Sequence, residues 1–194
     1  IAINTYCGDN DGKLPGPLKL GQRATYEPDE AGVLAQILEK YIGRKDTTDQ
    51  NRDEEGDDRT NVFVCPSWKR AKKDPESPVY ILNDEKVPDY DQMPWGDVEN
   101  NELPMRQAAL TAWRQRNKDS GEEVASMAKK WAITDVDIEF FRNSTAPSDF
   151  ADKLPRTPVH TDHRNALFYD WHVEKISLEK MDQIQKEARE NRLQ

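Results

Sequence analysis

The chain has 194 residues, of which 34% are charged and 35% hydrophobic, so it can bury one core but much of it must be loop or one-sided helix. No apolar run approaches the 18 or more residues of a membrane span, so no span is predicted within it. The net charge of −9 is concentrated in residues 46–59 and 83–102, and the nearly neutral remainder has no basic stripe with interleaved aromatic residues, which argues against nucleic-acid binding.

The first part of the chain predicts two helices. Residues 1–6 are typical of the last turns of a helix, which residues 8–12, rich in Gly, Asp and Asn, would end with a tight turn. A second helix is predicted to begin at Pro28 and to end before Gly43, with acids in its first turn. Residues 44–60 contain no apolar side chain and form the first acidic loop. The apolar side of the second helix consists of Val33, Leu34, Ile37, Leu38, Tyr41 and Ile42.

Short runs of β-branched residues predict the strands of the middle of the chain. Residues 61–65 and 79–82 each form such a run, and residues 83–103, rich in Asp, Asn and Pro, form the second acidic loop between the strands and later helices. Helical pieces are expected between positions 104 and 130, with Met105, Leu110 and Trp113 apolar. Residues 131–141 begin as a strand, with four candidates for burial and two acids at its end: Trp131, Ile133, Val136, Ile138, Asp135 and Asp137.

The C-terminal part predicts a β-hairpin and a final helix. Residues 165–169 and 172–176 form the two strands, joined by Asp170 and Trp171. Ser177 is expected to cap the helix that follows. A narrow apolar stripe on that helix consists of Leu178, Met181, Ile184 and Ala188.

All three histidines lie within residues 158–173, together with two acids. One interpretation is a zinc or iron site of a secreted metal-dependent hydrolase, because imidazoles and carboxylates are the ligands that these metals take. The other interpretation is that the histidines are turn and hairpin residues. Alternate residues of a straight strand share a face, but Asp170 and His172 lie at a turn, where they need not point the same way. The candidate ligands are His160, Asp162, His163, Asp170 and His172.

Other chemical motifs are weak. Residues 9–12 resemble a fragment of a calcium loop but lack its later ligands, so a turn is favoured. Asp135, Asp137 and Glu139 could supply calcium oxygens at a strand end or simply face water. No phosphate-binding loop, nucleophile elbow or Cys–His signature occurs. A ligand-binding module that uses Trp95, Trp113 or Trp171 in its loops is a further alternative, with buried tryptophans as the competing interpretation.

The cysteines, Cys7 and Cys65, are too few to build a disulfide scaffold. They could form one disulfide, which would stabilise the fold by about 4 kcal/mol in an oxidising compartment, or remain separate thiols.

The C-terminal run also carries a more specific pattern: His160, nine residues, Asp170, then His172 and Val173. This resembles the closing signature of the prepilin-type, pseudopilin-like proteins, His, nine residues, Asp-Gly and His-Val, with Trp171 in place of the Gly. Four further segments are similar to motifs of that family and occur in the same order. Residues 34–43 (LAQILEKYIG) are similar to the end of a helix in that family. The other three are residues 6–15 (YCGDNDGKLP), residues 63–67 (FVCPS) and residues 131–137 (WAITDVD).

The resemblance implies an α+β, type IV pilin-like fold with one domain over residues 1–194. A long N-terminal helix, half in the membrane, would pack on a small antiparallel sheet, with residues 1–8 as its stub and a C-terminal hairpin and extra helices. The implied function is a non-enzymatic structural subunit of a type II secretion pseudopilus or related filament. Its partners would be other pseudopilin subunits and the secretion machinery, and it would face the periplasm from the inner membrane. No cofactor is implied except calcium, whose ligands cannot be assigned here.

Two positions depart from the family pattern. Trp171 stands where a two-residue hairpin turn needs a positive φ, which Trp resists, so a longer or bulged turn is expected. Cys7 stands where the family has a small residue such as Ala, and only because of this departure could a disulfide with Cys65 form.

Overall fold

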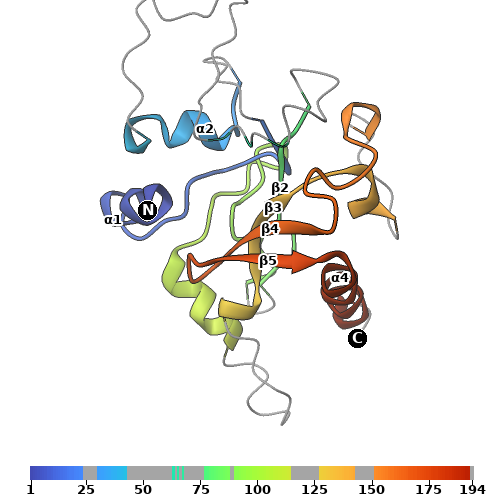
Figure 1. Ribbon diagram of the computed structural model, residues 1–194. Coiled ribbons are helices and arrows are strands. Elements are labelled where there is room, and N and C mark those ends of the chain that lie inside the picture. Colours follow the sequence, from blue (N-terminus) through green and yellow to red (C-terminus); the bar gives the residue numbers. More distant parts are fainter. Residues whose placement is uncertain are drawn as a thin grey trace, which may run out of the picture.

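The computed structural model describes residues 1–23, 30–42, 63, 65, 67, 77–87, 90–114, 127–142 and 151–192. In these ranges the chain is an α+β fold with an N-terminal helix, a five-stranded antiparallel sheet and a C-terminal hairpin followed by a helix (Figure 1). The strands are β1 (Gly21–Gln22), β2 (Tyr80–Leu82), β3 (Trp131–Asp135), β4 (His163–Phe168) and β5 (Val173–Ser177), and their order in the sheet follows the chain. The α-helices are α1 (Ala2–Asp9), α2 (Leu34–Ile37) and α4 (Leu178–Arg192), and the 3₁₀ helices are η1 (Glu39–Tyr41), η4 (Gln107–Arg114), η6 (Met127–Lys129), η7 (Ile138–Phe141) and η8 (Ala151–Lys153).

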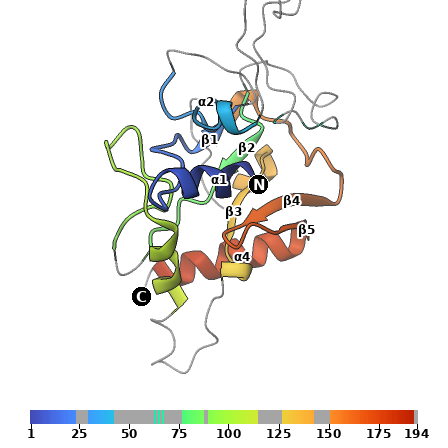
Figure 2. The same ribbon diagram turned by 90° about the vertical axis from the view of Figure 1, so that its left-hand side faces the viewer.

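Both faces of the sheet are apolar and covered. Along β4, Ala166 and Phe168 pack in one cluster with Met181 of α4, whereas Leu167 packs in the other, against α1 and α2. This alternation is that of a strand whose successive side chains point to opposite faces. In Figures 1 and 2, α1 and α2 accordingly lie on one side of the sheet and α4 on the other. None of the helices in the described part of the chain has the length and apolar character that crossing a bilayer requires.

The N-terminal helix and its turn are confirmed. Gly12 donates its N–H to the Cys7 carbonyl at 2.8 Å and has a φ of 74°, so the helix ends in the expected tight turn. Tyr6 packs edge-on against Tyr41 of η1, with ring centroids 5.5 Å apart, which joins α1 to the neighbouring helical segment.

The second helix begins later than predicted. Pro28 lies outside the described residues, and residues 30–33 are not helical, because Gly32 adopts a φ of 83° and Val33 is extended. The cap comes from the buried side chain of Gln22 on β1. Its Oε1 accepts the Leu34 N–H at 2.6 Å, and its Nε2 donates to the Gly32 carbonyl at 3.0 Å. The helix start is therefore set by a residue distant in sequence.

The helices predicted after residue 104 also differ from expectation. Met105 is not helical, because its N–H bonds to the Pro94 carbonyl and its carbonyl accepts from Leu14, both at 2.9 Å. Helical structure begins only at η4, and it is 3₁₀. The side chain of Trp113 lies outside the described residues.

The two acidic loops have different outcomes. Residues 44–60 lie outside the described residues. Residues 83–103, described apart from 88 and 89, form no named strand or helix, as expected, but the loop is anchored by Val87 and Trp95, which are both buried. The strand expected over residues 61–65 falls mostly outside the described part, and neither Phe63 nor Cys65 is in a strand.

The C-terminal hairpin and helix are confirmed, with β4 paired to β5. Ser177 caps α4 as predicted, since its Oγ accepts the Lys180 N–H at 3.2 Å. The buried stripe of this helix includes Met181, with Ile184 partly buried beside it.

A buried ion pair joins β4 to the segment after β3. Arg164 donates from Nε and one terminal nitrogen to the two carboxylate oxygens of Asp137, at 3.0 and 2.8 Å, and the side chains are 2% and 1% exposed. Asp137 also accepts the Phe140 N–H at 3.1 Å, which caps η7. The guanidinium lies 5.6 Å from the centre of the Phe140 ring. Each charge is thus paired and hydrogen-bonded, as burial requires.

Replacing Asp137 with Ala is expected to lower the free energy of unfolding by about 3–5 kcal/mol, because it leaves Arg164 buried without its counter-ion. Urea denaturation measures the loss. The control is Lys86→Ala, which breaks an exposed pair with Asp91 and should cost less than about 1 kcal/mol. Equal, small losses in both variants would contradict a role for the buried pair in stability.

Candidate functional site

The five candidate metal ligands separate into two groups. His160, Asp162 and His163 lie at the entry to β4, and Asp170 and His172 lie in the loop at its other end. The length of β4 alone separates the groups by roughly 16 Å at about 3.3 Å per residue. Within the described residues, no three His, Cys, Asp or Glu side chains are grouped so that they could hold a metal. The five candidate ligands therefore do not meet around one metal ion.

The two groups form local pairs instead. His163 Nδ1 lies 2.7 Å from a carboxylate oxygen of Asp162, and His172 Nδ1 contacts Asp170. The ring of His172 also stacks on Phe168, with centroids 4.4 Å apart. These contacts are those of turn and hairpin residues, which was the second interpretation of the histidines.

His160 is held in a polar cluster at the end of β3. Its Nε2 lies 2.8 Å from Asn165 Nδ2, 3.3 Å from Asp135 Oδ2 and 3.5 Å from Cys65 Sγ. Asp135 Oδ2 also accepts the backbone N–H of Asn165 at 2.9 Å. His160 therefore links the loop before β4 to both β3 and Cys65.

Burial dominates the electrostatics of this cluster. It raises the pKa of Asp135, while hydrogen bonds from Asn165 and the neighbouring imidazole of His160 act in the opposite direction. Burial also raises the pKa of Tyr80, and the negative charge of Asp135 raises it further. The native fold thus disfavours negative charge on both side chains.

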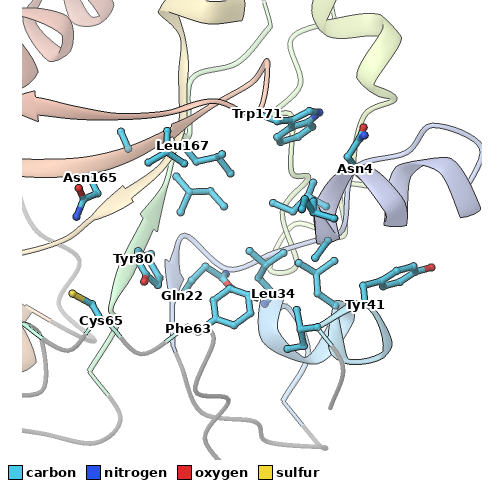
Figure 3. A pocket seen from close by; sticks show the side chains of 18 of the residues that line it. Asn4, Gln22, Leu34, Tyr41, Phe63, Cys65, Tyr80, Asn165, Leu167 and Trp171 are labelled. Carbon is cyan, nitrogen blue, oxygen red and sulfur yellow. Dashed lines mark hydrogen bonds between the residues drawn. The ribbon is translucent and has the colours of Figure 1, made fainter. Parts of the chain in front are cut away.

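A groove of about 710 Å³ opens beside this cluster (Figure 3). Cys65, Tyr80 and Asn165 lie at one end of it, and Trp171 and Asn4 lie toward the other. Its walls come from the first turn of α1, from the α2 segment and from the sheet, and they are mainly apolar. They include Ile3, Leu34, Leu38, Ile133 and Leu167.

The hairpin loop has the longer, bulged form that we predicted. Trp171 donates its N–H to the Phe168 carbonyl, and Phe168 donates its N–H to the His172 carbonyl, both at 2.9 Å. Residues 169–171 therefore form a three-residue loop, and Trp171 takes its left-handed position with a φ of 70°. The indole packs toward the core, 6.5 Å from the Trp95 ring, which offsets part of the backbone strain.

Trp95 and Trp171 pack against each other, Trp171 also lines the groove, and the side chain of Trp113 lies outside the described residues. Trp95 is 1% exposed and lies 5.9 Å from the buried ring of Tyr169. Trp171 belongs to the same aromatic group through its contact with Trp95. The competing interpretation, tryptophans that pack in the core, fits these two residues.

The acids considered as calcium ligands point to different partners. Asp135 contacts His160 and Asn165, Asp137 pairs with Arg164, and Glu139 pairs with Arg142 at 3.1 Å. They do not converge on one point, so the ligands of a calcium ion remain unassigned.

Both cysteines are free thiols in the structure, so the disulfide that we considered is not present in it. Cys7 is buried on α1, and Cys65 lies beside His160. The sequence showed no Cys–His signature because these two residues are 95 positions apart. The pairing exists only in the folded chain, and no local motif signals it.

Comparison with known proteins identifies no relative, because no family model, no curated protein and no solved structure matches the chain.

The variant Asp135→Asn is expected to change how stability depends on pH. Unfolded Asp titrates near pH 3.9, and burial raises the pKa in the folded chain, so ionisation destabilises the native protein progressively as the pH rises through the folded pKa. Asn does not ionise. The free energy of unfolding of the native sequence should therefore fall relative to that of the variant as the pH is raised from about 3.9 towards neutrality. Urea titrations across this range measure the difference, and a constant or opposite difference would contradict the assignment.

Replacing Trp171 with Gly and with Ala isolates the cost of its backbone conformation. Both variants lose the packing of the indole, but only Gly adopts a positive φ without strain, so the Gly variant should be more stable by about 1 kcal/mol. The control is the exposed strand residue Val173, where Ala should be more stable than Gly. If the Trp171→Ala variant were as stable as the Trp171→Gly variant, the left-handed conformation assigned to Trp171 would be wrong.

Proposed function

We propose that the chain is part of a non-enzymatic structural subunit of a type II secretion pseudopilus or a related type IV pilin-like filament. The observation that carries this proposal is the conformation of Trp171. It has a φ of 70° directly after Asp170, at the position where the family signature has Gly. A residue that resists this conformation nevertheless adopts it, so the requirement comes from the hairpin and not from the local residue.

The geometry also gives the spacing of the signature a physical reason. His160 is held at the end of β3 by Asp135 and Asn165, and Asp170 lies in the loop at the far end of β4. The nine residues between them are the entry turn, the strand and the first loop residue. The signature thus describes the frame of a hairpin, which suits a structural subunit better than an active site.

Asp170 and His172 support the loop between them. The carboxylate of Asp170 accepts the backbone N–H of His172 at 3.2 Å, and the His172 ring contacts the same oxygen. An Asx interaction of this kind stabilises a tight turn. The last residues of the signature therefore have a role in shaping the loop.

The proposal extends to the rest of the protein and to its partners. In it, α1 is the end of a longer N-terminal helix that anchors the protein in the inner membrane, with the domain in the periplasm. Other pseudopilin subunits and the secretion machinery are the partners. The packing of Ala2, Ile3 and Tyr6 of α1 against the core on one face of the sheet supports this arrangement. The hydrolase alternative has no comparable support, because its five candidate ligands lie at opposite ends of β4.

The amino-acid sequence upstream of Ile1 in the full-length protein tests the proposal. We expect a basic leader that ends in Gly, followed by Phe-Thr-Leu-Ile-Glu and about 20 apolar residues, because a filament subunit needs a membrane-spanning helix at this end. N-terminal analysis of the mature protein should show cleavage directly after the Gly. An ordinary signal peptide with a small-residue cleavage site would contradict the proposal.

A further inference from the structure

The proposed filament function does not use the thiol of Cys65. This side chain is half-buried and lines the groove, and its Sγ lies 3.5 Å from Nε2 of His160. A nucleophile within reach of a base, with the base held by a third group, is the arrangement that activates thiols in proteins. We therefore considered what chemistry this pair can perform.

The surroundings of His160 suit the acceptance of one proton. The amide nitrogen of Asn165 lies 2.8 Å from Nε2 and donates to it in the neutral ring, so the thiol and this amide share the one lone pair of Nε2. Nε2 takes the thiol proton when the Asn165 amide turns its oxygen towards the ring. Asp135 Oδ2 lies 3.3 Å from the same nitrogen, and its side chain is 5% exposed. A carboxylate there stabilises the imidazolium that forms when the ring takes a proton.

The arrangement differs from a catalytic triad in one respect. In a triad the third group holds the other ring nitrogen, whereas here the thiol, the amide and the carboxylate all meet Nε2. Nε2 can take the proton from Cys65, but the ring is not held in the way that repeated acid and base steps require. The geometry favours a single nucleophilic event over catalytic turnover.

We propose that Cys65 is a thiol-modification site that reacts with small disulfides carrying apolar or aromatic groups. His160 takes the proton of the Cys65 thiol, and the thiolate attacks one sulfur of the disulfide. The S–S bond of the reagent breaks as a new S–S bond forms to Cys65, and the released thiolate takes the proton back from His160. The disulfide is the oxidant, and one mixed disulfide and one free thiol are the products.

The groove accounts for the choice of ligand. The thiol lies at the polar end of a mainly apolar cavity, next to Phe63 and Tyr80, whose rings are 6.5 Å apart. Among the residues that the structure describes, the titratable groups beside His160 and Cys65 are Tyr80 on β2, Asp135 on β3 and His163 on β4. The ring of His163 stacks on that of His160, with centroids 5.1 Å apart. A neutral aromatic disulfide fits this setting better than an anionic one, because the cavity is mainly apolar. Cys7 is 2% exposed on α1 and should not react in the folded chain.

The test uses 2,2′-dithiodipyridine with the Cys7→Ala variant, in which Cys65 is the one remaining cysteine. The rate of release of the pyridine thione is followed from pH 5.5 to pH 9, for the folded chain and for the same chain in urea. We expect the folded chain to react at least about tenfold faster than the urea-unfolded chain at pH 6, because an ordinary thiol is almost fully protonated there. Mass spectrometry should place the adduct on Cys65.

Two further variants separate the base from its surroundings. His160→Gln in the Cys7→Ala background keeps a polar side chain but removes the base. In this variant the folded chain should no longer react faster than the urea-unfolded chain at pH 6. His163→Gln removes the stacked imidazole, and in this variant the folded chain should still react faster than the urea-unfolded chain at pH 6. If the His160 variant fails to fold, the pH profile of the Cys7→Ala chain still decides. The proposal would be overturned if the folded chain reacted at the same rate as the urea-unfolded chain at each pH, or more slowly than it at every pH.

Discussion

The buried pair of Arg164 and Asp137 is the constraint on which the surrounding structure depends. Two charges can be removed from water only if they are paired in good geometry and their other hydrogen-bonding groups are satisfied. Here both conditions hold, because the pair is bidentate and Asp137 also caps η7. Arg164 and Asn165 are consecutive on β4 and point to opposite faces, so Asp137 and Asp135 contact β4 from its two faces. The two acids together fix the start of β4.

His160 takes its position from that fixed strand. It lies just before β4 and contacts Asp135 and Asn165 at one end of the hairpin, while the left-handed Trp171 closes the other end. The signature that suggested a pilin-like filament subunit can therefore be understood as a set of geometric requirements on one hairpin. The same anchoring brings His160 next to Cys65, so a structural requirement places a base beside a thiol.

Features of the fold that are set by residues close together in the sequence could be predicted, whereas features set by residues far apart in the sequence could not. The hairpin, the Ser177 cap and β2 follow from local alternation and capping, and they were predicted from the sequence. The predicted start of the second helix was wrong, because the start of α2 is set by Gln22, twelve residues before Leu34. Asp135 and Asp137 were recognised as acids at a strand end, but their partners were not, since an Arg on another strand leaves no local signal. The pairing of Cys65 with His160 was missed for the same reason.

We propose that the chain belongs to a filament subunit, and filament formation by the full-length protein tests this proposal most directly. The full-length protein would be overproduced in cells that contain a pseudopilus or pilus assembly system, and filaments sheared from the surface would be examined by electron microscopy and immunolabelling. The account predicts labelled filaments that disappear when the prepilin peptidase is deleted. Protein recovered only as a monomer in the periplasm, whether or not the peptidase is present, would contradict it.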